Sequence, residues 1–230
     1  MTSTHQPTSS ISIIIPTLNE AGNIAALAQN LNGTESEIII VDGGSEDATV
    51  ELARHHGFAI LHSPPGRGVQ NNTGAASASG SILLFLHADT RLPQNFEKLI
   101  IAALNSPEHI AGAFRLSIDQ GTAAMRFVAF CANLRSSLLK LPYGDQAIFV
   151  RKKDFLQLGK YPEIPIMEDY LFIKKAQKSG KIILLQNYVT TSARRWRRLG
   201  VLRTTLINQL VVIGYHLNIS IERLARLYRS

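Results

Sequence analysis

The sequence lacks several features that secreted and membrane-spanning proteins need. Its one cysteine, Cys131, excludes an intramolecular disulfide and fits a reducing compartment. Residues 1–10 are polar and carry no hydrophobic segment of a secretory signal, so we expect a disordered tail on a cytoplasmic protein. The apolar stretch at residues 206–217 is interrupted by polar residues and is too short to span a bilayer.

Two phosphate-binding motifs are also absent. No G-x-G-x-x-G occurs, which excludes the dinucleotide fingerprint, and no G-x-x-x-x-G-K-[ST] occurs, which excludes a Walker loop. A nucleotidyltransferase-like enzyme remains an alternative, but it should carry a glycine-rich loop with a lysine after its first strand. The sequence has PTLNE there, at residues 16–20, which disfavours that alternative.

Acidic residues are scarce at the C-terminal end. Residues 1–190 hold 16 Lys or Arg against 16 Asp or Glu, whereas residues 191–230 hold eight Arg and one Glu. The whole net charge of +7 therefore lies in the last 40 residues. A non-enzymatic nucleic-acid-binding protein would use such a tail, but aromatic residues are sparse there, and we expect no nucleic-acid partner. A basic amphipathic helix also fits an anionic membrane surface.

The first half of the chain alternates short strands with helices. Apolar runs predict strands at residues 11–15, 37–41, 58–61 and 82–86, with a helix after each of the first three. Short links between alternating strands and helices predict a parallel sheet with right-handed crossovers.

The periodicity changes in the second half. It predicts strands at residues 110–118, 146–150 and 182–185, and helices at 121–141, 152–158, 168–180 and 199–228, the last interrupted near 218–220. A helix is also predicted to begin at Pro93. We therefore expect an α/β fold with a mostly parallel sheet flanked by helices. A C-terminal helical appendage, residues 199–230, should pack on the core or face a membrane.

Polar residues follow three predicted strands at the same end. They are PTLNE at 16–20, DGGS at 42–45 and HAD at 87–89. Because the carboxyl ends of parallel strands lie side by side, we expect these residues to converge on a ligand. Arg67 is placed to reach a phosphate, with Asn72 nearby. For each residue alone, the structural alternative is a helix cap, a turn or a solvated loop.

Glu168 and Asp169 stand at the start of a predicted helix, after a proline-rich approach. A helix N-terminus favours ionised carboxylates. An ionised carboxylate beside a bound sugar is what a general base needs to accept a proton from an attacking hydroxyl. The alternative is an acidic pair that only stabilises the first turn.

Together these motifs resemble the family-2 glycosyltransferases, inverting enzymes with the GT-A (Rossmann-like) fold. The resemblance covers residues 11–196 and rests on SIIIPTLNE, IIIVDGGSEDAT, GRGVQNNTGA, LFLHADT, GDQAIFVRK and PIMEDYLF. HADT in place of the usual two-aspartate motif, with GDQ and MED, is similar to a small bacterial subgroup. The resemblance implies one domain at 11–198, with a nucleotide-sugar-binding half at 11–105 and an acceptor half at 106–198.

The resemblance also implies a nucleotide-sugar donor, most often a UDP-sugar, and roles for individual residues. The donor-binding positions are Pro16, Thr17, Glu20, Asp42, Gly43, Arg67, Asn72 and Ala88. Asp89 matches the metal-binding aspartate for Mg²⁺ or Mn²⁺, and His87 stands where the family has its first aspartate. Asp169 matches the catalytic base, with Glu168 as second choice.

The acceptor side is less defined. We expect Asp145, Arg195 and Trp196 near the acceptor or the pyrophosphate. The segment SARRW at 192–196 is similar to the QxxRW motif of processive synthases, but Ser192 replaces its glutamine, which favours non-processive transfer. We therefore expect a metal-assisted, inverting, hexosyltransferase-type enzyme, associated peripherally with the cytoplasmic face of the membrane. Its unidentified acceptor would be lipid-linked or lipophilic.

Overall fold

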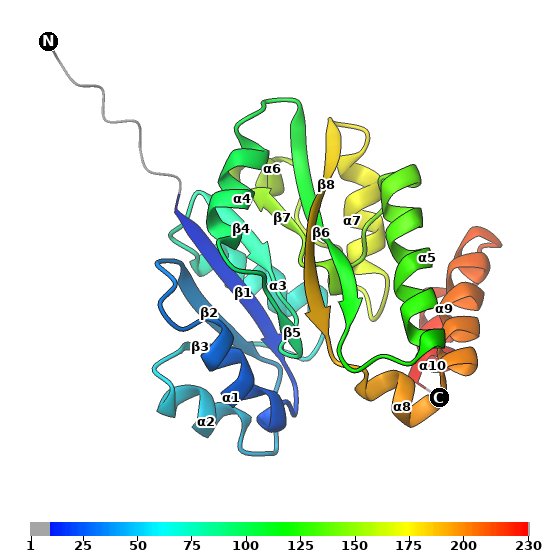
Figure 1. The fold of residues 1–230 in the computed structure, drawn as a ribbon, viewed down its shortest axis with the longest axis horizontal. Helices are drawn as coiled ribbons and strands as arrows, with labels where there is room; N and C mark the ends of the chain where they lie inside the picture. Colours follow the sequence, from blue (N-terminus) through cyan, green and yellow to red (C-terminus); the bar gives the residue numbers. More distant parts are fainter. Residues whose placement is uncertain (1–9, 230) are drawn as a thin grey trace, which may run out of the picture.

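A computed structural model describes residues 10–229 of the 230-residue chain. The predicted disordered tail at 1–10 therefore lies, except for its last residue, outside the described residues. Figure 1 shows a central sheet covered by helices, with the C-terminal helices side by side at one end of it. This is the predicted α/β fold with a C-terminal helical appendage, and that prediction is confirmed.

Within residues 10–229 the sheet has eight strands in the order β3-β2-β1-β4-β7-β6-β8-β5. The strands are β1 (Ile11–Thr17), β2 (Glu37–Asp42), β3 (Ala59–His62), β4 (Ile82–Phe85), β5 (Thr90–Arg91), β6 (His109–Ile118), β7 (Phe149–Arg151) and β8 (Lys181–Thr191). β1 pairs in parallel with β2 and β4, β2 with β3, and β6 with β8. β7 runs antiparallel to β4 and β6, so it joins two parallel parts.

The helices cover both faces of this sheet. They are α1 (Ala21–Asn30), α2 (Thr49–His55), α3 (Arg67–Ser77), α4 (Phe96–Leu104), α5 (Ala123–Leu139), α6 (Lys152–Gln157), α7 (Glu168–Ala176), α8 (Arg194–Leu199), α9 (Val201–His216) and α10 (Ile221–Arg229), with a 3-10 turn, η1 (Gly144–Gln146). Because successive side chains of a strand point to opposite faces, Ile14 of β1 joins the cluster with α3 and α7. Its neighbours Ile13 and Ile15 join the cluster with α1 and α4.

Several boundaries differ from the predictions, and three of these differences have a clear cause. β8 is longer than the predicted 182–185, because after a register shift its polar second half pairs with β6, as in Tyr188 opposite Arg115. α4 begins at Phe96 rather than at Pro93, after Asn95 in the left-handed region (φ 57°). The predicted strand start Gln146 lies in η1, where its fully buried side chain bonds to Ser136 and to the carbonyl of Phe114.

The C-terminal helices pack on the core. The predicted interruption near 218–220 is confirmed, since α9 ends at His216 and α10 begins at Ile221. Ile207 and Val211 of α9 and Leu224 of α10 are buried in the same cluster as α3 and α7. Among residues 10–229, no helix combines the length and the apolar character that a bilayer span requires.

The close approach of α3 to the sheet gives a stability test. A Cβ at Gly74 would lie 2.5 Å from Ile14 Cγ2 and 3.0 Å from Val41 Cγ2, and both neighbours are fully buried. Gly74→Ala should therefore lower the free energy of unfolding by about 1–3 kcal/mol through overpacking. Gly22 of α1 has no atom within 4 Å of such a Cβ, so Gly22→Ala should be neutral or stabilising by up to about 1 kcal/mol. Urea denaturation measures both, and equal changes would contradict the packing.

Candidate active site

A cavity of about 1030 Å³ lies where the carboxyl ends of β1 and β4 meet the second half of the chain. Its walls come from the ends of these strands, the start of α3, η1, the approach to α7, and the helices α8, α9 and α10. The predicted site residues that line it are Pro16, Thr17, Glu20, Arg67, His87, Ala88, Asp89, Asp145, Glu168, Asp169, Arg195 and Trp196. The expected convergence of distant polar residues at one sheet edge is therefore present.

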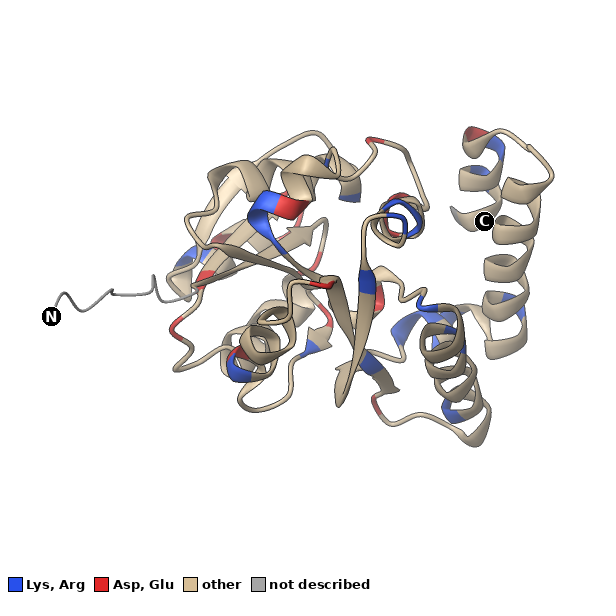
Figure 2. Cartoon of the chain, turned by 90° about the horizontal axis from the view of Figure 1, so that it is seen from above, with Lys and Arg blue, Asp and Glu red and all other residues tan. Residues whose placement is uncertain are grey.

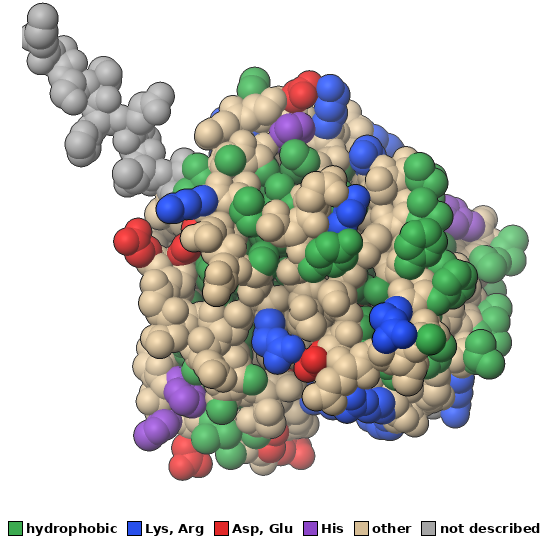
Figure 3. Space-filling view, viewed as in Figure 1, with side chains coloured by type: hydrophobic (Ala, Val, Ile, Leu, Met, Phe, Trp, Pro, Cys, Tyr) green, Lys and Arg blue, Asp and Glu red, His purple; other side chains and the backbone are tan. Residues whose placement is uncertain are grey.

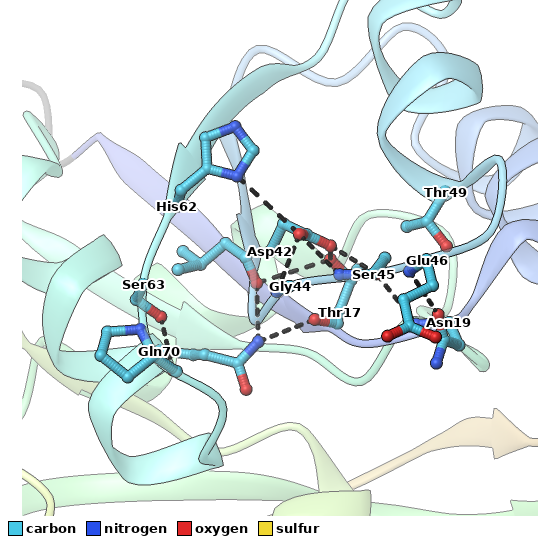
Figure 4. A network of polar contacts seen from close by, with 12 residues as sticks. Thr17, Asn19, Asp42, Gly44, Ser45, Glu46, Thr49, His62, Ser63 and Gln70 are labelled. Atoms are coloured by element: carbon cyan, nitrogen blue, oxygen red, sulfur yellow. Dashed lines mark hydrogen bonds and ion pairs between the residues drawn. The ribbon is translucent and has the colours of Figure 1, made fainter.

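Asp42 and Gly43 lie beside this cavity and are not among the residues that line it. The Asp42 carboxylate accepts hydrogen bonds from the backbone N–H groups of Gly44 and Ser45, both at 2.9 Å, and from the Ser45 hydroxyl at 2.5 Å (Figure 4). Burial would raise the pKa of Asp42, but these hydrogen bonds outweigh burial and lower it. Asp42 thus shapes its own loop, as the capping alternative expected.

That loop is tied to the end of β1. Gly43 N–H donates to the Thr17 carbonyl at 2.9 Å. The buried Gln70 amide donates to the carbonyls of Thr17 and Val41, both at 2.8 Å (Figure 4). A side chain from α3 therefore holds the ends of β1 and β2 together, a role with no local signal in the sequence.

Asn72 is also outside the cavity walls. Its side-chain amide donates to the carbonyl of Tyr161 at 2.9 Å and accepts from the Tyr161 N–H at 3.1 Å. This two-way bond ties α3 to the segment that leads into α7. Asn72 therefore positions the part of the chain that carries Glu168 and Asp169.

Arg67 is a cation inside the cavity. It begins α3, where solvent in the cavity reaches it although protein surrounds it. Burial would lower its pKa, but Tyr228, Glu168 and Asp169 outweigh burial and raise it. Gly68 must be a glycine, because a Cβ there would collide with the carbonyl of Pro162. Arg67 therefore stays charged and faces the acidic pair.

The acidic pair at the start of α7 is held in two environments. Asp169 accepts hydrogen bonds from the N–H of Gly144 at 2.5 Å and from that of Tyr170 at 2.6 Å. A Cβ at Gly144 would lie 3.1 Å from His87 Nε2 and 3.2 Å from Asp169 Oδ2, so the end of β4, η1 and α7 meet at one point. Burial raises the pKa of Glu168 to about 7, helped by the charge of Asp169 and opposed by Arg67.

The HADT segment places two further titratable groups in the cavity. Burial, reinforced by the positive charge of Arg67, lowers the pKa of His87 to about 3, so its imidazole is neutral at pH 7. Burial raises the pKa of Asp89, as does Glu20, whereas Arg194 and Arg67 lower it. In the described part of the chain, no group of three or more His, Cys, Asp or Glu side chains is arranged to hold a metal ion.

Asp89 and His87 form a pair that fits a cation whose remaining ligands come from a substrate. Mg²⁺ is usually held by one or two carboxylates together with substrate phosphates and waters, rather than by a full cage of protein ligands. Asp89 supplies a hard oxygen ligand, and the neutral imidazole of His87 is the form that binds metals. The donor set therefore suits a cation shared with a diphosphate.

The C-terminal segment supplies cavity residues that the sequence did not reveal. Arg194 binds both carboxylate oxygens of Glu20, at 2.8 and 3.0 Å, across the rim. The Arg195 guanidinium lies 3.8 Å from the centre of the Tyr228 ring, and Tyr228 lines the same cavity as Arg67. These contacts join α8 and α10 to the donor-facing side of the cavity.

Unpaired polar atoms mark a second part of the cavity. Asp145 Oδ1, Trp196 Nε1 and Asn208 Oδ1 are buried and have no hydrogen-bond partner among the described residues, and all three residues line the cavity. Burial raises the pKa of Asp145 to about 6, against the opposing effect of Arg135. Together they offer acceptor and donor groups that a bound molecule would satisfy.

The family model described as glycosyl transferase family 2 matches residues 12–157, more than half of the chain. The chain belongs to this family. It is a glycosyltransferase, and the expected resemblance and enzyme class are confirmed. The two alternatives, a nucleotidyltransferase-like enzyme and a non-enzymatic basic binding protein, lose their support.

Curated relatives carry the same activity in their names. Glycosyltransferase AglE of Haloferax volcanii is 29% identical over 188 residues, which cover 74% of this chain and 62% of that protein. The PGL/p-HBAD biosynthesis glycosyltransferase of Mycobacterium bovis is 29% identical over 216 residues, which cover 86% of this chain and 80% of that protein. This glycosyltransferase thus spans less than two thirds of AglE.

Solved structures share its fold at low sequence identity. S. aureus TarS 1–349, in complex with UDP-GlcNAc, gives a TM-score of 0.64 at 20% identity and covers 80% of this chain and 58% of that one. Glucosyl-3-phosphoglycerate synthase from Mycobacterium tuberculosis, in complex with Mn²⁺, UDP and glucosyl-3-phosphoglycerate, gives a TM-score of 0.63 at 21% identity. This match covers 88% of this chain and 79% of that one. This glycosyltransferase therefore shares its fold with both of these solved structures.

The buried Glu168 predicts a pH dependence of stability. Its folded-state pKa of about 7 exceeds its ordinary value of 4.5, so its contribution to stability is full below pH 4.5 and is lost as the pH rises through 7. The free energy of unfolding of Glu168→Gln, relative to that of the wild type, should therefore be higher at pH 8.5 than at pH 4.5 by on the order of 3 kcal/mol. Denaturant titrations of the wild type and the variant at the two pH values measure these free energies. A stability difference between the two proteins that is the same at both pH values would contradict the prediction.

Proposed function

We propose that this glycosyltransferase moves a sugar from a nucleotide-sugar, a UDP-sugar, to an acceptor hydroxyl, with inversion and one transfer per binding event. The observation that carries the proposal is the single cavity in which Arg67, Asp89 and Asp169 lie together. In support, similar folds are those of TarS with UDP-GlcNAc and of glucosyl-3-phosphoglycerate synthase with Mn²⁺ and UDP. The non-processive character is argued from Ser192, which replaces the glutamine of the processive motif.

In this proposal the first half of the domain, 11–105, binds the donor. Pro16, Thr17 and Ala88 form the wall at the ends of β1 and β4, where the nucleoside would lie. The loop of Asp42 and Gly43 supports that wall from outside. Glu20, now paired with Arg194, would contact the donor from the rim.

Arg67 binds the diphosphate in the proposed complex. A guanidinium forms charge-assisted hydrogen bonds with phosphate oxygens, and these bonds are stronger where water is partly excluded. The same charge offsets the negative charge that develops on the nucleoside diphosphate as the glycosidic bond to it breaks. Tyr228 of α10 lines the same cavity.

Asp89, with His87, would hold a Mg²⁺ or Mn²⁺ ion in the same complex. When bound, such an ion acts as a Lewis acid toward the phosphate oxygens of the donor. Of the two residues, Asp89 is the stronger candidate because a carboxylate is the harder ligand. The raised pKa of Asp89 without a cation is what a bound positive charge would reverse.

Asp169 is the proposed general base. It accepts the proton of the acceptor hydroxyl while the hydroxyl oxygen forms a bond to the anomeric carbon, on the face opposite to the departing diphosphate. Backbone N–H groups of Gly144 and Tyr170 hold its carboxylate in place. Glu168, whose pKa burial raises, is the second candidate.

The second half of the domain, 106–198, would bind the acceptor. Asp145 and Trp196 offer unpaired polar atoms to acceptor hydroxyls, and Arg195 borders the same space. We expect the acceptor to be lipid-linked or lipophilic and the enzyme to work at the cytoplasmic face of a membrane.

Removing the proposed base should separate chemistry from binding. Asp169→Asn should lower kcat by about 10²–10⁴-fold, because no carboxylate then accepts the proton, while donor affinity changes by less than about threefold. Glu168→Gln is the matched control and should keep most of the activity. Turnover with a UDP-sugar donor measures the first effect, and titration of that donor measures the second. Unchanged turnover in Asp169→Asn would remove Asp169 from this role.

Removing the proposed donor contacts should weaken nucleotide binding. Thermal shift with UDP, with and without Mn²⁺, should show at least about tenfold weaker affinity for Arg67→Met, since a charge-assisted contact is lost. Asp89→Asn should abolish the added effect of Mn²⁺. Arg54→Met, which removes an exposed arginine from α2, is the control. If Arg67→Met and Arg54→Met bind UDP equally, the diphosphate site is wrong.

A further inference from the structure

The outer face of α9 is apolar and exposed. Its large apolar residues recur every three or four positions and are between 42 and 88% exposed: Leu202, Leu206, Leu210, Ile213 and Leu217. The opposite face packs inward through Ile207 and Val211, which are buried. A helix that is apolar all round is normally surrounded by apolar material. In the described chain, α9 is covered on one side only.

A second apolar stripe lies on α5. Phe127, Phe130, Leu134 and Leu138 recur at helical spacing and are 46 to 70% exposed. α5 contacts α9. In Figure 3, hydrophobic side chains run down α5 and continue toward the right edge, where Figure 1 places α9. We call these two stripes together the α5–α9 face; exposed apolar patches that span two helices mark interaction surfaces.

The helices α5 and α9 of this face, and α8 beside it, hold charges of one sign. Within the described residues, α5, α8 and α9 carry arginines and no Asp or Glu (Figure 2). Arg126 lies next to the stripe on α5, and Arg197 and Arg198 are exposed on α8, the helix that leads into α9. An apolar surface with a basic border is complementary to an anionic bilayer, whose headgroups attract the arginines while the apolar side chains enter the acyl boundary.

We infer that the α5–α9 face docks on an anionic lipid bilayer surface. The opposite side of α9 lines the catalytic cavity through Thr204, Asn208 and Val211. One helix, about 10 Å across, therefore separates the cavity from the docked surface. Resting on the proposed function, this geometry brings the acceptor end of the cavity next to lipid, where a lipid-linked hydroxyl is presented.

The test is co-sedimentation of the full chain with vesicles, which needs no turnover and so is independent of the proposed reaction. Vesicles of phosphatidylcholine with phosphatidylglycerol are compared with pure phosphatidylcholine, at low and high salt. The variant is Phe130→Gln with Leu206→Gln. The control is Leu156→Gln, which removes a 46% exposed leucine from α6, away from the α5–α9 face.

The wild type and the control should bind the anionic vesicles, more weakly at high salt and at least about tenfold more weakly on pure phosphatidylcholine. The double variant should bind at least about tenfold more weakly than the control, since two apolar side chains no longer enter the bilayer. A second variant, Arg197→Gln with Arg198→Gln, should lose affinity and salt dependence together. Unchanged thermal unfolding of the variants shows that they are folded.

Two results would overturn the inference. The first is that the wild type does not bind anionic vesicles, or that the double variant binds them as strongly as the wild type does. The other is a dimer in sedimentation velocity that the double variant dissociates, without vesicle binding, because the α5–α9 face would then join two copies of the chain.

Discussion

A charged guanidinium held inside a cavity walled by carboxylates is the interaction on which the site depends. Arg67 lowers the cost of placing Glu168 and Asp169 near each other, and their negative charges in turn raise the pKa of Arg67. Glu168 is buried, and an unpaired carboxylate there would be costly. The fold provides it by placing the start of α3 opposite the start of α7, with Asn72 tying the two segments together.

The C-terminal helices form part of the wall of this site. Tyr228 of α10 lines the cavity with Arg67 and stacks under Arg195, and the inner face of α9 forms part of the cavity wall. The segment that looked from its composition like a basic appendage therefore has two faces with different tasks. Its inner face belongs to the reaction site, and its outer face is available for docking.

Local patterns predicted most of the sheet and its functional edge, because the strands β1, β2 and β4 are apolar runs that end in polar residues. They did not predict the second half of β8, whose exposed Gln186 and Asn187 break the apolar pattern. They also did not show which polar residues face the cavity. Asp42 is satisfied by amides of its own loop and Asn72 by a backbone 89 residues away, which only the folded chain decides. The cavity likewise brings Tyr228 together with Arg67 from distant parts of the chain, which leaves no local signal.

The most direct test of this account is a crystal structure of the protein with UDP and Mn²⁺. The account predicts the diphosphate in the cavity at the ends of β1 and β4, within hydrogen-bond distance of Arg67, with the ion between it and Asp89 and with Asp169 facing the vacant acceptor space. A nucleotide bound elsewhere, or bound in the cavity with its diphosphate away from both Arg67 and Asp89, would contradict it.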